Sequence, residues 1–178
     1  MLLEMMCRAE LNRKPISLYT NQANTNKFEV GYLVGFDHDN FILERVSQEG
    51  KRDGYLFGRT PLIYRIERDT IYLRKILKLM AFNGFEKHDI CFDQKDLLSN
   101  FIEFAYKEQK IMSVELFDSN NQDIIGTVSE FTSEFCTVNQ ISEYGEPDGY
   151  STFRLEDISY IVYHSEEQKL IEVLQAEH

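Results

Sequence analysis

Several features that would narrow the function are scarce or missing in this sequence. It has no tryptophan, three prolines and three cysteines in 178 residues. Three widely spaced cysteines do not make a disulfide framework, so we expect a reducing compartment and a cytoplasmic protein. No apolar run reaches the roughly 18 residues of a membrane span, and a charge interrupts the apolar start of the chain. We therefore expect neither a signal peptide nor a membrane association.

Catalytic signatures are also missing. The sequence contains no Gly-x-Ser-x-Gly, phosphate-binding loop, dinucleotide-binding pattern or His-Glu-x-x-His. His38, His88 and His164 are dispersed along the chain, and no serine or cysteine partner can be identified for them. We therefore expect a protein that is not an enzyme and that carries no metal and no other cofactor.

Positive charge is scarce in the second half of the chain. Residues 1–80 hold 13 Lys and Arg against 10 Asp and Glu, whereas residues 81–178 hold 6 against 20. The net charge of −11 argues against a simple nonspecific nucleic-acid binder. Two interpretations remain open: charge that keeps the protein soluble, or two surfaces with different partners.

What the sequence does contain is an internal repeat. A shift of 95 residues places residues 31–66 on residues 126–161 without a gap, and ten of these 36 positions are identical. About two or three identities are expected by chance. The identical positions include Asp-Gly-Tyr at 53–55 and at 148–150. We interpret the chain as two copies of one small unit.

Each copy has the pattern of five short antiparallel strands. In the first copy they are expected at residues 16–20, 28–36, 41–46, 55–59 and 63–66, and the second copy repeats them between 112 and 163. Gly31 and Gly35 predict a bend or bulge in the second strand. Thr60-Pro61-Leu62 predicts a short break before the last strand. Helical periodicity predicts helices over 72–80, 96–106 and 167–176.

The predicted fold class is therefore mainly β with flanking helices (α+β). We expect a tandem duplication of a five-stranded Sm-like or SH3-like barrel, each followed by a helix. Residues 1–80 would form the first barrel with its trailing helix, residues 81–110 a helical linker, and residues 111–178 the second barrel with the C-terminal helix.

Two motifs resemble those of the Sm-like RNA-binding proteins. Gly31-Tyr-Leu-Val-Gly-Phe-Asp-His-Asp-Asn-Phe-Ile-Leu43 is similar to the first motif of that family, and Arg59–Ile66 and Arg154–Ile161 are similar to the second. The resemblance implies an Sm-like fold and single-stranded RNA binding. The RNA-binding residues that it implies are Asp37, His38, Asn40, Arg59 and Arg154.

The sequence departs from the family pattern at several of these positions. Asp37 and Asn40 are one residue closer than the family spacing, and the second copy has Thr132 and Phe135 in their place. A closed family ring needs about six or seven units, so three chains would make a pseudo-hexamer. The linker and added helices would oppose ring closure, and we expect a monomer or dimer.

Each candidate also has a structural interpretation. Asp37, His38 and Asn40 would form a solvated turn, and Arg59 and Arg154 would hold the short break or pair with a carboxylate such as Asp157. The two Asp-Gly-Tyr segments would be hairpin turns, with glycine at positive φ and tyrosine packed on the barrel. The residues are Asp53, Gly54, Tyr55, Asp148, Gly149 and Tyr150.

Two hypotheses for the function follow. The first is a protein-interaction or regulatory module whose exposed strand edges accept a partner protein, which the sequence does not identify. The second is an RNA-binding adaptor that uses the more basic first copy. Its cations would form one patch: Arg45, Lys51, Arg52, Arg59, Arg65 and Arg68.

Overall fold

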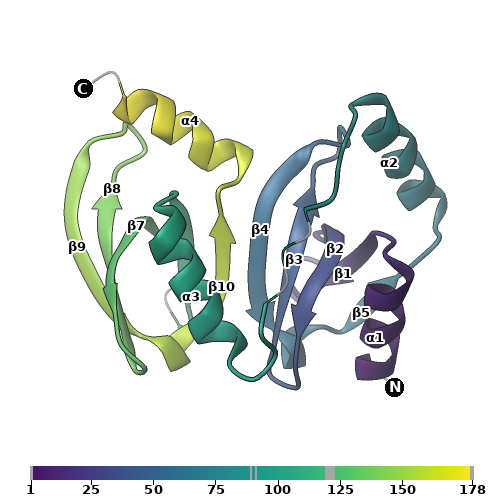
Figure 1. The fold of residues 1–178 in the computed structure, drawn as a ribbon, viewed down its shortest axis with the longest axis horizontal. Coiled ribbons are helices and arrows are strands. Elements are labelled where there is room, and N and C mark those ends of the chain that lie inside the picture. The colour runs from purple at the N-terminus through teal and green to yellow at the C-terminus, as the bar shows by residue number, and fades with distance from the viewer. Residues whose placement is uncertain (1, 89, 91, 119–122, 177–178) are drawn as a thin grey trace. The chain divides into compact units, whose positions relative to one another are not determined.

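The computed structural model is mainly β with four helices, which confirms the α+β class (Figure 1). It describes residues 2–88, 90, 92–118 and 123–176. The helices are α1 (Leu2–Asn12), α2 (Ile71–Phe82), α3 (Leu97–Glu108) and α4 (Glu166–Gln175). The strands are β1 (Ile16–Tyr19), β2 (Glu29–Phe36), β3 (Asn40–Val46), β4 (Arg52–Arg59), β5 (Arg65–Glu67), β6 (Met112–Leu116), β7 (Ile124–Phe131), β8 (Phe135–Ile141), β9 (Pro147–Arg154) and β10 (Ile158–Tyr163).

The chain divides into two compact units. Unit 1 comprises Met1–Gly54 and Gly58–Leu97, and unit 2 comprises Tyr55–Phe57 and Leu98–His178. The stretch 81–110, expected as a linker, is thus shared between the units. Helix α3 packs within unit 2, where the rings of Phe104 and Tyr163 are 5.4 Å apart.

The strands follow the same order in both units. In unit 1 the order is β5-β1-β2-β3-β4, and in unit 2 it is β10-β6-β7-β8-β9. The strand pairs within each unit are antiparallel, and in the described residues they run in a line and do not close into a ring. A short 3₁₀ turn joins the last two strands of each unit along the chain. It is η1 (Thr60–Leu62) between β4 and β5, and η2 (Leu155–Asp157) between β9 and β10.

Backbone irregularities recur at a spacing of 95 residues. The expected bulge lies between Leu33 and Gly35 in unit 1, and unit 2 has one between Val128 and Glu130. The cap of the trailing helix recurs as well, since Thr70 caps α2 and Ser165 caps α4. A Cβ at Gly31 would lie 2.1 Å from the Glu44 carbonyl oxygen, so this strand position admits only glycine.

A trailing helix covers each sheet at equivalent positions. In unit 1, Ile76 of α2 is buried in a cluster with Val46 of β3. In unit 2, Ile171 of α4 is buried with Ile141 of β8. These pairs are also 95 residues apart, so the same helix face meets the same strand in both units.

The Asp-Gly segments do not form the hairpin turns that the sequence predicts. The turns lie earlier, where the N–H of Ser47 donates to the Lys51 carbonyl at 2.8 Å and that of Ser142 donates to the Glu146 carbonyl at 2.9 Å. Asp53-Gly54-Tyr55 lies inside β4 and Asp148-Gly149-Tyr150 inside β9. Gly54 and Gly149 do adopt positive φ, at 72° and 80°. The chain turns at the serine and not at Asp-Gly, because the serine hydroxyl accepts two further backbone N–H groups in each unit.

Each hairpin turn contacts its trailing helix at a glycine, Gly50 in unit 1 and Gly145 in unit 2. Both have positive φ, and a Cβ there would lie 2.6 Å from the Met80 nitrogen in unit 1 and 2.5 Å from the Gln175 nitrogen in unit 2. Gly149 also has positive φ, but nothing lies within 4 Å of its Cβ position.

We expect Gly145→Ala to destabilise the protein by about 3 kcal/mol, because it adds a clash with the α4 backbone to the cost of positive φ. Gly149→Ala is the matched control, with an expected loss of about 1 kcal/mol from positive φ alone. Urea unfolding followed by circular dichroism measures both. Equal losses would show that α4 does not rest on this turn.

Candidate functional site

Four of the five residues implied by the family resemblance lie together in unit 1. The turn between β2 and β3 is held by Asp37, whose carboxylate accepts the N–H groups of Asp39 at 2.8 Å and Asn40 at 2.6 Å. His38 lies in this turn and is exposed. The Nη1 of Arg59 donates to the Asn40 side-chain oxygen at 2.8 Å.

The Asn40 side chain is buried and that of Arg59 is half-buried, whereas His38 is exposed. Asn40 is 8% exposed, so its amide offers little to a ligand. Burial lowers the pKa of the Arg59 guanidinium, and the charges of Asp39 and Asp37 act in the opposite direction. The N–H of Thr60 donates to the Asp39 carbonyl at 2.9 Å, which ties the break after β4 to the same turn. The expected turn is present and Arg59 bonds to it, but Asn40 is buried in the turn and not solvated.

The fifth residue, Arg154, lies in unit 2 without an equivalent network. Its Nη1 lies 3.3 Å from Glu156, so it pairs with a carboxylate as expected, although with the neighbour of Asp157, and both side chains are exposed. The turn before it is nevertheless the same, because the Thr132 hydroxyl accepts the N–H groups of Glu134 and Phe135. The second copy thus keeps the backbone of the turn without the carboxylate or the amide.

Four of the five arginines expected to form a basic patch are engaged inside unit 1. Arg45 lies 3.0 Å from Glu29, Arg52 lies 3.0 Å from Glu44, and Arg65 pairs with Glu67. Arg59 bonds to Asn40. These contacts neutralise much of the positive charge that the sequence assigns to the first copy.

Glu44 is the most deeply buried of these carboxylates. Its side chain has no exposed surface, and one oxygen accepts from Arg52 Nε and, at 3.3 Å, from the backbone N–H of His88. Arg52 also donates to the Glu86 carbonyl and lies over the Phe85 ring, 5.3 Å from its centre. This network fastens the segment after α2 to β3 and β4.

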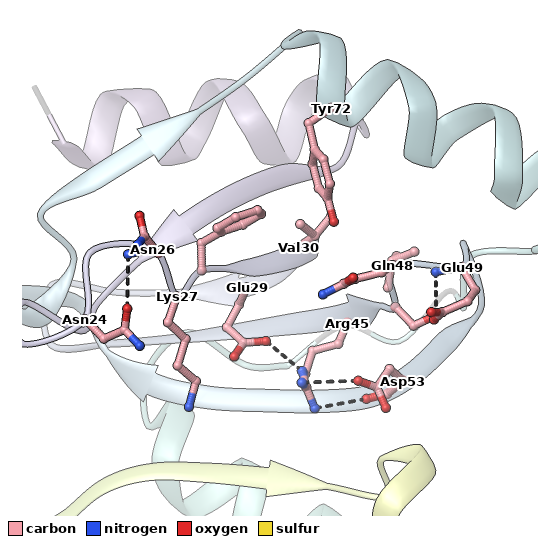
Figure 2. A pocket seen from close by; sticks show the side chains of 13 residues that line it. Asn24, Asn26, Lys27, Glu29, Val30, Arg45, Gln48, Glu49, Asp53 and Tyr72 are labelled. Carbon is pink, nitrogen blue, oxygen red and sulfur yellow. Dashed lines mark hydrogen bonds and ion pairs between the residues drawn. The ribbon is translucent and has the colours of Figure 1, made fainter.

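A polar pocket of about 700 Å³ lies elsewhere in unit 1. Figure 2 shows the Tyr72 hydroxyl pointing toward the Arg45 network, with Gln48 and Glu49 on one side and Lys27 on the other. The Phe28 ring packs edge-on against Tyr72, with centroids 5.3 Å apart. The lining residues are Asn24, Asn26, Lys27, Phe28, Glu29, Val30, Arg45, Val46, Ser47, Gln48, Glu49, Asp53 and Tyr72.

An ion network of three residues forms one wall of this pocket. Arg45 Nε lies 3.0 Å from Glu29 Oε2, and Arg45 Nη2 lies 3.2 Å from Asp53 Oδ2. The side chain of Arg45 is 18% exposed, that of Glu29 16% and that of Asp53 17%. Burial raises the pKa of Tyr72, and the negative charge of Glu49 raises it further. The ion network of the wall has two carboxylates, Glu29 and Asp53, and one cation, Arg45.

This pocket was not predicted from the sequence. Arg45 was expected in a basic patch and Asp53 in a hairpin turn, and Glu29 and Tyr72 were not candidate residues. A signal was present, because the positions of Glu29 and Arg45 hold Ile124 and Gln140 in the second copy. Only the fold shows that these two differences fall on one ion pair.

Comparisons with known proteins find no relative. No family model matches the chain, and no curated protein and no solved structure is significantly similar to it. Within the described ranges, no three or more His, Cys, Asp or Glu side chains gather as a metal site would require. The helices in the same ranges are all too short or too polar to cross a bilayer.

The structural role of Arg59 can be tested against Arg154, which occupies the equivalent position in unit 2. We expect Arg59→Ala to lower the free energy of unfolding by about 1–3 kcal/mol, because it leaves the buried Asn40 oxygen without this donor. Arg154→Ala removes an exposed ion pair and is expected to cost less than about 0.5 kcal/mol. Urea titration measures both, and an equal effect of the two would contradict a structural role for Arg59.

Proposed function

We propose that the chain is a non-enzymatic protein-interaction or regulatory module built from two tandem Sm-like (SH3-like) units, whose sheets are open in the described residues. The common strand order, the bulges 95 residues apart and the 3₁₀ turn before the last strand support the duplicated fold. The proposed contact is the edge strand β9, which would accept an extended, basic segment of a partner protein.

The exposure of β9 is the observation that carries this proposal. The strand ends the order of unit 2, and its ladder partner is β8 (Figure 1). Tyr150 is 78% exposed, whereas Tyr55, its equivalent in β4, is 5% exposed. A long edge strand with exposed aromatic side chains is a template for strand addition, since its outer backbone groups can pair with another chain.

The negative charge around β9 favours a partner segment that carries positive charge. Glu143 and Glu146 are exposed in the turn before the strand, and Asp148 is exposed within it. The chain from residue 81 onward holds 20 acidic against 6 basic residues. A basic extended segment is therefore favoured over an acidic one by long-range attraction and by the avoidance of like charges.

RNA binding through the first copy is the second candidate. The contact of Arg59 in β4 with the turn that holds Asp37 and Asn40 favours it. The burial of Asn40 and the ion pairs of the arginines weaken it, because a base-binding site needs these groups at the surface. We rank protein interaction first and expect a monomer or dimer.

Two peptides of about eight residues test the β9 proposal. One alternates valine with lysine, and the other has glutamate in place of lysine. We expect the lysine peptide to bind at least about tenfold more tightly in fluorescence anisotropy. Hydrogen exchange should then show protection of the β9 amides, because strand addition gives them new acceptors.

Tyr150→Lys should weaken this binding about tenfold by placing a charge on the accepting edge. Leu170→Lys in α4 is the matched control, because Leu170 is 67% exposed and gains the same charge. Binding without β9 protection, or an equal loss in both variants, would overturn the assignment. Salt-sensitive binding of short U-rich or A-rich RNA in a filter assay, without peptide binding, would favour the second candidate.

A further inference from the structure

We propose that the pocket lined by Lys27, Glu29, Arg45, Glu49 and Tyr72 binds a small organic cation, an alkylammonium or guanidinium group. The pocket belongs to unit 1 alone, and the inference goes beyond the protein-interaction function, which uses β9 in unit 2.

The fold does not require the ion network of this pocket. Taking charges out of water is costly even when they are paired, so a largely buried network is weak evidence of a stabilising role. Unit 2 has the same strand order and the same turn, yet Ile124 and Gln140 replace the Glu29–Arg45 pair. Because an equivalent scaffold forms without the pair, we infer that the pair serves the pocket.

The charges on the wall favour a cation. Glu29, Glu49 and Asp53 bring three carboxylates, and Arg45 is held between two of them. Lys27 is the other cation of the lining and lies on the far side from Glu49 (Figure 2). A ligand ammonium or guanidinium in this pocket would offset the excess negative charge of the lining.

The aromatic wall fits the carbon chain and the charge of such a ligand. The Phe28 and Tyr72 rings contact each other and offer apolar surface beside the carboxylates. Tyr72 already attracts an ammonium group, since Lys75 Nζ lies 5.5 Å from its ring centre. An aromatic face beside carboxylates is a recurring arrangement for organic cations. The pocket of about 700 Å³ accommodates a ligand of this size.

The same cationic group can come from a free amine or from a lysine or arginine side chain of another protein. Agmatine and cadaverine are the probes for the free amine, acetyl-arginine methylamide is the probe for the side chain, and glutarate is the anionic control. Amide shifts of isotope-labelled full-length protein report binding and its location. We expect the cations to shift the pocket amides with dissociation constants of about 1 mM or below, and glutarate to leave them unchanged.

Three variants test the chemistry of the pocket. Glu49→Gln should weaken agmatine about tenfold, since it removes one charged acceptor. Lys27→Met should strengthen agmatine, because it removes a competing positive charge. The double variant Glu29→Ile with Arg45→Gln gives unit 1 the residues of unit 2 at unchanged net charge. It should keep the fold and lose at least about tenfold in affinity.

Glu143→Gln is the matched control, because it makes the same charge change in the equivalent turn of unit 2 and should leave agmatine binding unchanged. Tyr150→Lys should also leave it unchanged, which separates this inference from the β9 proposal. Wild-type affinity in the folded double variant, weaker agmatine binding in Lys27→Met, or no saturable shift of the pocket amides up to about 10 mM amine would overturn the assignment. If the double variant unfolds, opposite effects of Glu49→Gln and Lys27→Met support the pocket, and any other pair of results contradicts it.

Discussion

The trailing helix of each unit packs against a turn glycine at which there is no room for a side chain, and this contact sets how the helix lies over the sheet. Gly50 lies against the end of α2, while Ile76 of the same helix is buried with Val46 of β3. These two contacts fix the helix over the sheet. The start of α2 then carries Tyr72 to the Phe28 ring, which makes the aromatic wall of the pocket. The pocket thus follows from how the helix is seated.

The second copy shows which parts of this arrangement belong to the scaffold. Its helix is seated in the same way, with Gly145 against the end of α4 and Ile171 buried with Ile141. Its turn before β8 has the same backbone hydrogen bonds, although a Thr132 hydroxyl replaces the Asp37 carboxylate. Asp37 is therefore explained by the turn it closes. The Glu29–Arg45 pair has no such explanation, because the second copy does without it.

Much of the fold could be predicted from the sequence because it rests on local patterns. Alternation placed the strands to within a few residues, and Gly35 marked the bulge in β2. The hairpin turns were misplaced because Asp-Gly is a strong turn signal, whereas the serine of residues 47 and 142 closes the turn through hydrogen bonds that composition does not reveal. The pocket could not be predicted, since Arg45 meets Glu29 and Asp53 only through cross-strand register.

The structure shows where the unevenly distributed charges of the two halves lie. Part of the positive charge of the first half is engaged within unit 1, where Arg45, Arg52 and Arg65 pair with carboxylates and Arg59 bonds to Asn40. In the second copy the acidic residues around β9 are exposed, and Arg154 pairs with an exposed Glu156. Since the backbone of both units is set by glycines, capping hydroxyls and buried aliphatic residues, charged side chains could change between the copies without loss of the fold. Unit 1 has its ion network at the wall of a pocket, and unit 2 has exposed acidic residues around β9.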